Sequence, residues 1–195
     1  AAIFHCTLGT AYRGLTRARV HAGARVLVTG ANGGVGAAAV QIATRLGATV
    51  IAQVRRDAHA ELAQQLGASE VVVDDGATIH KRVQPVDVAI DCVGAPTFNA
   101  AVRSLGVGGR AVAIGNVVDA RVELNLGYLI TRGLQVTGSS GATRADMAAL
   151  LALHAKHPFA MPIHARLPIA EAERAQRIVK DGGLTGRVVL EPMHL

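Results

Sequence analysis

Short apolar strands alternate with helical segments along most of this chain, and this alternation restricts its fold more than any other feature. From about residue 24 onward, β-branched runs end at turn residues and are followed by stretches whose apolar residues recur at helical spacing. Strands that are apolar on both faces and alternate with helices indicate a parallel sheet covered on each side. The sequence therefore predicts one doubly wound α/β domain over residues 1–195, with six main strands and helices on both faces.

The same patterns place the individual elements. Strands are expected at 25–30, 49–54, 70–73, 86–93, 110–114, 134–137 and 187–190. Helices are expected at 7–20, 35–46, 57–66, 96–105, 144–156 and 170–180. The polar stretch 74–85 is expected to be a loop with at most one helical turn.

A glycine-rich turn, Thr29 to Gly36, joins the first strand to the helix that follows it. A pyrophosphate group needs several backbone N–H groups directed at it, and side chains on such a turn would block its approach. The free N–H groups and the dipole at the start of a helix also favour an anion. Gly36 would let the helix pack closely on the strand, although Ala31 stands where the usual fingerprint has glycine. The turn therefore predicts binding of a dinucleotide.

The end of the second strand discriminates between the two nicotinamide cofactors. An NAD site has Asp or Glu there, which accepts a hydrogen bond from the ribose 2′-hydroxyl. The segment Ile51 to Arg56 has no acid before Asp57 and instead ends in Arg55 and Arg56. Two guanidiniums suit a 2′-phosphate, while the alternative is a pair of surface arginines at a strand end. The sequence predicts NADPH, with NADH the less favoured cofactor.

The net charge of +6 comes from seventeen Arg and three Lys against fourteen acidic residues. The arginines are scattered along the chain and no nucleic-acid motif accompanies them, so we expect a solvated basic surface and no nucleic-acid partner. Cys6 and Cys92 make no disulfide framework, which favours a reducing, cytoplasmic location. No apolar run is long enough to span a membrane and no signal peptide is visible. The chain starts at Ala1 without Met, so we expect it to be part of a longer protein.

Short-chain dehydrogenases share the Thr-Gly-x-x-x-Gly-x-Gly pattern of this turn, which makes them a competing assignment. Those enzymes carry a catalytic Tyr followed four residues later by Lys. Here Tyr12 is followed at that spacing by Thr16, and Tyr128 by Arg132. The absence of this pair argues against the short-chain family.

Five segments in order resemble the medium-chain dehydrogenase/reductase superfamily, which includes zinc-type alcohol dehydrogenases and quinone oxidoreductases. These segments are 1–15, 24–36, 86–94, 109–115 and 186–190. Residues 114–117, 126–129 and 141–144 look most like the acryloyl-CoA reductase branch. The resemblance implies a Rossmann fold, and it implies that this chain is the C-terminal cofactor-binding domain of an oxidoreductase acting on a small-molecule substrate. A GroES-like catalytic domain, which that superfamily carries, has no counterpart here.

The resemblance also assigns residues to the cofactor. The turn residues are Asn32, Gly33, Gly34, Val35 and Gly36, and Arg55 and Arg56 hold the adenosine ribose and its 2′-phosphate. Two strand-end loops line the nucleotide, namely Cys92, Val93 and Gly94, and Ile114, Gly115 and Asn116. The alternative for either loop alone is a simple strand-to-helix turn. Thr10 matches a position near the nicotinamide, and Arg187 one near the phosphates. No catalytic residue is assigned within this chain, which alone should bind NADPH without turnover.

Three further expectations concern the intact protein. In zinc-dependent members a cysteine at the position of Cys6 completes a catalytic zinc site, while the alternative for Cys6 is a small buried apolar residue. The resemblance implies a homodimer formed through the sixth strand, at 134–138. Two other functions stay open at this point: a non-catalytic nucleotide-binding module, and an enoyl-reductase segment of a multienzyme synthase.

Overall fold

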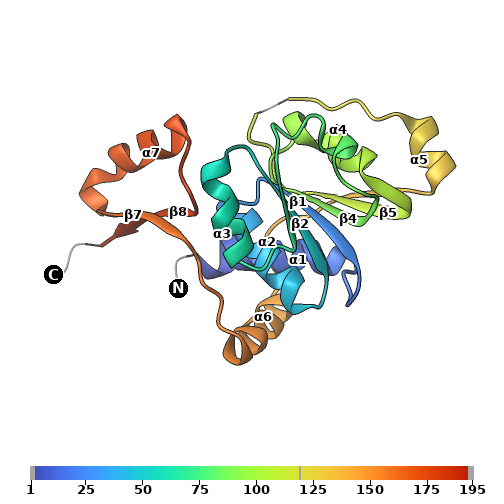
Figure 1. Ribbon diagram of the computed structural model, residues 1–195. Coiled ribbons are helices and arrows are strands. Elements are labelled where there is room, and N and C mark those ends of the chain that lie inside the picture. The colour runs from blue at the N-terminus through green and yellow to red at the C-terminus, as the bar shows by residue number, and fades with distance from the viewer. Residues whose placement is uncertain (1–2, 119, 193–195) are drawn as a thin grey trace.

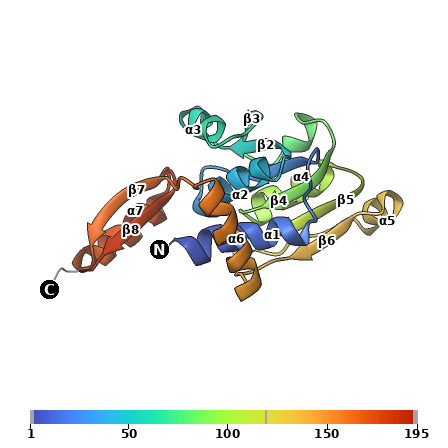
Figure 2. The same ribbon diagram turned by 90° about the horizontal axis from the view of Figure 1, so that it is seen from below.

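A six-stranded parallel sheet with helices on both faces forms the body of the molecule (Figures 1 and 2). The computed structural model describes residues 3–118 and 120–192. The strand order is β3-β2-β1-β4-β5-β6, and every neighbouring pair is parallel. This order reverses direction between β1 and β4, which is the switch point where doubly wound sheets form their ligand crevice. The predicted fold class is confirmed.

The sheet strands are β1 (Arg25–Thr29), β2 (Thr49–Val54), β3 (Glu70–Val73), β4 (Val86–Asp91), β5 (Leu105–Ala113) and β6 (Gln135–Gly138). The helices around the sheet are α1 (Thr10–Arg17), α2 (Gly34–Arg45), α3 (Ala60–Gln65), α4 (Ala95–Arg103), α5 (Leu126–Arg132) and α6 (Arg144–Lys156). A π-helical turn η1 (Phe4–Gly9) precedes α1, and short 3₁₀ turns lie at η2 (Asp57–His59) and η3 (Ile79–Lys81).

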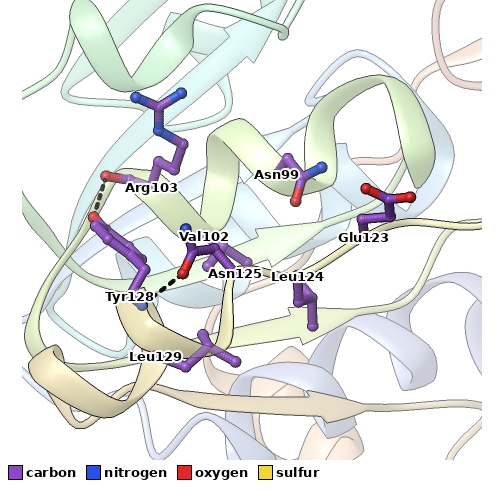
Figure 3. Close-up of a pocket in the computed structure, with 8 residues that line it drawn as sticks. All are labelled: Asn99, Val102, Arg103, Glu123, Leu124, Asn125, Tyr128 and Leu129. Carbon is purple, nitrogen blue, oxygen red and sulfur yellow. Dashed lines mark hydrogen bonds between the residues drawn. The ribbon is translucent and has the colours of Figure 1, made fainter.

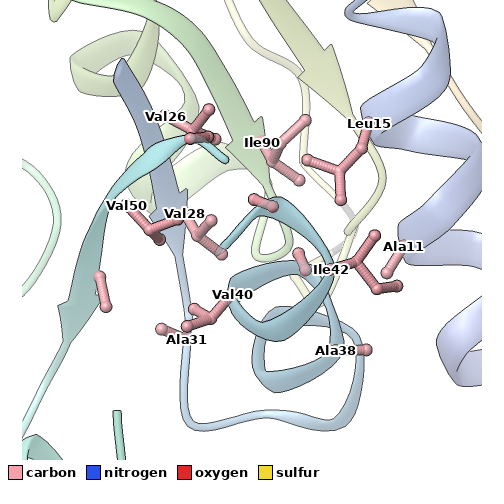
Figure 4. Close-up of a cluster of buried hydrophobic side chains, with 14 of the residues drawn as sticks. Ala11, Leu15, Val26, Val28, Ala31, Ala38, Val40, Ile42, Val50 and Ile90 are labelled. Atoms are coloured by element: carbon pink, nitrogen blue, oxygen red, sulfur yellow. The ribbon is translucent and has the colours of Figure 1, made fainter. Parts of the chain in front are cut away.

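The two faces of the sheet carry separate hydrophobic cores. Within β1, Val26 and Val28 are buried in the core beneath α1 and α2, and Leu27 between them is buried in the core beneath α4. Successive side chains of a strand point to opposite faces, so a strand covered on both sides is apolar throughout. Figure 4 shows the α1 and α2 side, where Ile42 and Leu15 pack against the sheet. Each such fully buried side chain contributes roughly 1.5–3 kcal/mol through lost water contact.

The C-terminal residues form a separate parallel pair of strands, drawn at the left of Figure 1. This unit consists of β7 (Ile163–Pro168), η4 (Ile169–Glu171), α7 (Ala172–Asp181) and β8 (Arg187–Glu191). The predicted strand at 187–190 exists, but it pairs with β7 and does not join the main sheet. A hollow of about 340 Å³ opens on this unit between α7 and β8, lined largely by apolar side chains.

Several predicted boundaries were wrong. The expected helix 7–20 is a π-helical turn followed by a shorter α-helix, and the strand expected at 110–114 begins at Leu105. Helix α5 and strand β7 were not predicted. Both are short segments with mixed polar and apolar residues, so their pattern carries little helical or strand periodicity. Among the described residues, no helix has the length and apolar character that crossing a membrane requires.

Candidate functional site

The predicted glycine turn lies at the C-terminal edge of the sheet, between the end of β1 and the start of α2. The N–H of Gly33 donates to the carbonyl of Gly30 over 3.0 Å, and the N–H of Ala31 donates to the carbonyl of Gln53 on β2 over 2.9 Å. Gly33 is the N-cap of α2, so no side chain is available there to accept from the first helical N–H groups. The first turn of α2 also contains no acidic residue. This helix start therefore offers backbone donors and a positive dipole end to an anion.

Close packing explains the glycine at position 36. A Cβ atom at Gly36 would collide with the carbonyl oxygen of Gly30 and lie 2.8 Å from the Cα of Ala31. The helix can therefore approach the turn this closely only without a side chain at that position. The structure gives Gly36 the packing role that the sequence predicted.

Arg187 of β8 reaches the same turn from the opposite end of the chain. A Cβ atom at Gly34 would collide with Cδ of Arg187 and lie 3.2 Å from its Nε. Gly186 pairs with Gly33 in an isolated parallel bridge, which brings the adjacent Arg187 over the helix start. A guanidinium beside the positive end of a helix is electrostatically unfavourable until an anion lies between them. Arg187 thus lies beside the glycine turn, and its role near the phosphates stays a prediction.

A cleft of about 270 Å³ opens in front of the turn, between the ends of β1, β2 and β4. Of the residues predicted to bind cofactor, it brings together Asn32, Gly33, Arg55, Cys92 and Val93. It is also lined by residues that were not predicted: Gly30, Gln53, Asp75, Pro96, Thr97, Val117 and Val118. The exposed side chains of Val117 and Val118 give one wall an apolar surface that a flat ring can contact.

Gln53 is a functional candidate that the sequence analysis missed. Its side-chain oxygen accepts from the N–H of Gly30 over 2.9 Å, and its Nε2 donates to the carbonyl of Asp74 over 2.6 Å. The residue is 1% exposed, so both of its polar groups are satisfied inside the protein. Gln53 thereby fixes the glycine turn to the end of β3. One polar residue within the otherwise apolar run 50–54 of β2 was the available signal.

Asp91, at the end of β4, organises the loop that carries Cys92 and Val93. One carboxylate oxygen accepts from the N–H groups of Val93 and Gly94, and the other accepts from the hydroxyls of Thr29 and Thr97. The side chain is completely buried. Burial raises the pKa of Asp91, and the hydrogen bonds offset only part of this effect. Asp91 therefore has a structural role in this loop.

The two strand-end loops pack directly against each other. A Cβ atom at Gly94 would lie 2.9 Å from the carbonyl oxygen of Gly115, and one at Gly115 would collide with the backbone of Cys92. The N–H of Val117 donates to the carbonyl of Val93 over 2.9 Å. Gly94, Gly115 and Asn116 line an adjoining hollow of about 350 Å³ beside α4. Apart from Ile114, the predicted loop residues are thus divided between two neighbouring hollows.

The remaining predicted residues are not among those that line this cleft. Val35 and Gly36 lie in the first turn of α2, and Ile114 packs on α1, where a Cβ at Gly14 would meet it at 2.7 Å. Thr10 is buried at the start of α1. The roles of these residues toward a cofactor stay predictions.

Arg55 and Arg56 separate at the end of β2. Arg55 lines the cleft, whereas the Arg56 guanidinium lies against Gly183, with Nη1 2.8 Å from where a Cβ of that glycine would stand. Both arginines stand close to the buried His59. Burial lowers the pKa of His59, and the charges of Arg56 and Arg55 lower it further. The positive charges at the end of β2 therefore come from the two guanidiniums, without a contribution from His59.

The two cysteines are free thiols with no sign of nucleophilic activation. Burial raises the pKa of the Cys92 thiol, and the neighbouring Asp91 charge raises it further, so the thiol stays protonated. Cys6 is exposed on η1. Within residues 3–118 and 120–192, no group of three or more His, Cys, Asp or Glu side chains could hold a metal ion. These residues do not fit a complete zinc site.

A larger hollow of about 420 Å³ lies away from the glycine turn, between α4 and the segment leading into α5 (Figure 3). Beside this hollow, Asn125 caps α5 by accepting from the N–H of Tyr128, and the Tyr128 hydroxyl donates to the carbonyl of Arg103. Its lining includes no residue of the strand ends or of the glycine turn. The smaller cleft at the switch point is therefore the candidate cofactor site.

Known proteins with similar sequences and structures include dehydrogenases and reductases. The family model of zinc-binding dehydrogenases matches residues 34–156. The acryloyl-coenzyme A reductase of Metallosphaera sedula is 35% identical over 191 residues, covering 97% of this chain and 57% of that protein. The crystal structure of AibC has a TM-score of 0.92 at 36% identity, covering 99% of this chain and 56% of that one. A thermostable alcohol dehydrogenase from Pyrobaculum aerophilum has a TM-score of 0.89 at 31% identity, covering 98% and 57%. The chain thus spans little more than half the length of these relatives.

Proposed function

This chain belongs to the zinc-binding dehydrogenase family, and from that premise we propose that it is the cofactor-binding domain of an NADPH-dependent oxidoreductase. The observation that carries the proposal is the cleft in front of the glycine turn, with Arg55 at one end and Arg187 over the helix start. The turn supplies backbone N–H groups for a pyrophosphate, and Arg55 supplies a cation for a 2′-phosphate. The domain extends over residues 1–195, and its C-terminal unit would contact the remainder of the protein.

The proposed reaction is reduction of an activated alkene, such as an enoyl-CoA, with carbonyl reduction as the alternative. The name of the Metallosphaera sedula relative, an acryloyl-coenzyme A reductase, supports the alkene substrate. When bound, NADPH supplies the hydride that is transferred to the substrate. The residues of this chain hold and orient the dinucleotide, and groups that polarise the substrate or donate a proton would come from outside the chain. This chain alone should bind NADPH and catalyse no turnover of enones or aldehydes.

Substitution of Arg55 tests the cofactor preference. Arg55→Ala should weaken NADPH binding about 10- to 100-fold and change NADH binding less than about threefold, because charge-assisted hydrogen bonds to a phosphate are worth roughly 1.5–3 kcal/mol. Fluorescence titration of both cofactors at two salt concentrations measures this difference. Arg177→Ala is the matched control, since Arg177 is an exposed arginine of α7 paired with Glu173. Equal affinity of the unsubstituted chain for NADPH and NADH would contradict the proposal.

Zinc in the intact protein would require ligands from outside this chain. Cys6 is exposed and accessible for this purpose, and it is the residue that this chain would contribute. Zinc analysis of the intact protein with Cys6→Ser tests this, and unchanged zinc content in the variant would argue against a ligand role.

We further propose that the protein is a cytoplasmic homodimer that pairs through β6. β6 is an edge strand of the main sheet, and Val136 on it is 38% exposed. An open edge with an apolar, β-branched residue offers backbone groups to a second copy. Val136→Pro should therefore shift the protein from dimer toward monomer in light scattering. A protein that is entirely monomeric at high concentration before substitution would argue against this pairing.

A further inference from the structure

The segment 182–187, here called the closing segment, crosses the glycine turn and joins α7 to β8. The N–H of Gly186 donates to the carbonyl of Asn32 over 2.9 Å, and Nδ2 of Asn32 donates to the carbonyl of Leu184 over 3.3 Å. These two bonds involve residues more than 150 positions apart in the sequence. The closing segment therefore contacts the glycine turn. It ends at Arg187, whose side chain lies above the start of α2.

The side chain of Thr185 connects the closing segment to the residues that follow β2. Oγ1 of Thr185 and Nδ1 of His59 form a hydrogen bond of 2.9 Å. His59 is only 7% exposed, and it ends the short 3₁₀ turn that follows Arg55 and Arg56. The bond joins the cationic end of β2 to the segment that carries Arg187.

The hydrogen bond between Thr185 and His59 acts against an electrostatic repulsion. The closing segment brings Gly183 against the Arg56 guanidinium and Arg187 over the positive end of α2. Within the described part of the chain, Arg187 forms no ion pair that would compensate for this position. Before an anion binds, Arg187 is held by the hydrogen bond of its own N–H to the carbonyl of Pro162 over 3.0 Å and by bonds of the closing segment such as that between His59 and Thr185. Such an arrangement keeps the cation preorganised for a ligand.

We propose that His59 and Thr185 are positioning residues that hold the closing segment across the turn and thereby present Arg187 to the pyrophosphate of the dinucleotide. The inference rests on the proposed function, because it assumes that a dinucleotide occupies the cleft. It adds residues that act on the cofactor through Arg187 and do not themselves contact it. The proposal also explains why a buried histidine lies beside two arginines. The neutral imidazole of His59 forms the hydrogen bond to Thr185 without adding a positive charge beside the guanidiniums.

Thr185→Val tests the proposal, because it removes the hydroxyl with little change in volume. With the 195-residue chain, NADPH binding should weaken about five- to tenfold, as expected for one lost hydrogen bond. Binding of adenosine 2′-monophosphate, which has the 2′-phosphate and no pyrophosphate, should stay within about twofold. Thr185→Ser keeps the hydroxyl and should restore NADPH binding. His59→Gln provides a second variant, and the melting temperature of every variant shows whether it is folded.

A double-substitution cycle with Arg187→Gln separates positioning from a merely structural role. If Thr185 acts through Arg187, Thr185→Val should have no further effect on NADPH binding in the Arg187→Gln background. Additive losses, or equal losses for NADPH and adenosine 2′-monophosphate, would overturn the inference while leaving the proposed function intact. Failure of the unsubstituted chain to bind any nicotinamide dinucleotide would overturn the proposed function, and this inference with it.

Discussion

Gly36→Val should abolish detectable NADPH binding, a loss of more than about 100-fold, and should lower the free energy of unfolding by about 3 kcal/mol. A side chain at this position collides with the carbonyl of Gly30, which is backbone and has no rotamer to change. The helix start must then move away from the turn, so the backbone donors lose their common direction. Titration calorimetry with NADPH measures the binding loss, and urea denaturation measures the change in stability.

Gly138→Ala is the matched control for Gly36→Val. Gly138 ends β6, and a Cβ atom there would meet no atom within 4 Å. Its alanine variant should keep both NADPH affinity and stability close to those of the unsubstituted chain. If Gly36→Val bound NADPH as well as Gly138→Ala, the turn would not be the pyrophosphate site.

Asp91→Ala should lower the free energy of unfolding by about 3–4 kcal/mol and also weaken NADPH binding. The substitution leaves four donors without their acceptor, two of them backbone N–H groups and two of them buried threonine hydroxyls. The N–H groups belong to Val93 and Gly94, in the loop that forms one wall of the cleft. Chemical denaturation and NADPH titration together measure both effects.

Asp91→Asn is the informative control. Its side-chain oxygen can still accept from Val93 and Gly94, and its amide can donate to the oxygens of Thr29 and Thr97. The asparagine variant should therefore be far more stable than the alanine variant. Similar stability of the two variants would show that these hydrogen bonds contribute little.

The pH dependence of stability provides an independent check on Asp91. Burial raises the pKa of this carboxyl in the folded protein above its value in the unfolded chain. The protonated carboxyl therefore favours folding, and this contribution is fully present below the unfolded pKa of 3.8 and is lost as pH rises through the folded pKa. Relative to Asp91→Asn, the unsubstituted protein should thus lose stability as pH rises from about 4. An opposite slope would mean that hydrogen bonding outweighs burial.

The sequence predicted some residues of the candidate site and missed others, and this difference has a physical reason. The turn from Thr29 to Gly36 was found because glycine, strand and helix signals all lie within one short segment. Gln53 was missed because only its contact with Gly30, 23 residues away, gives it a role. His59 and Thr185 were missed because their bond joins positions 126 residues apart. Arg55 and Arg56 are adjacent residues of the same type, so the sequence does not distinguish their roles. Only Arg55 lines the cleft.

Local pattern by itself determined the alternation of strands and helices, the parallel sheet and the glycine turn, because hydrophobic periodicity and backbone freedom are properties of neighbouring residues. The tertiary structure alone decided that β8 pairs with β7 outside the main sheet, and that the segment ending in Arg187 returns across the turn. It also decided that Asp91 would be completely buried and would accept four hydrogen bonds. Such contacts depend on the distance between side chains that folding brings together, and no short stretch of sequence encodes that distance.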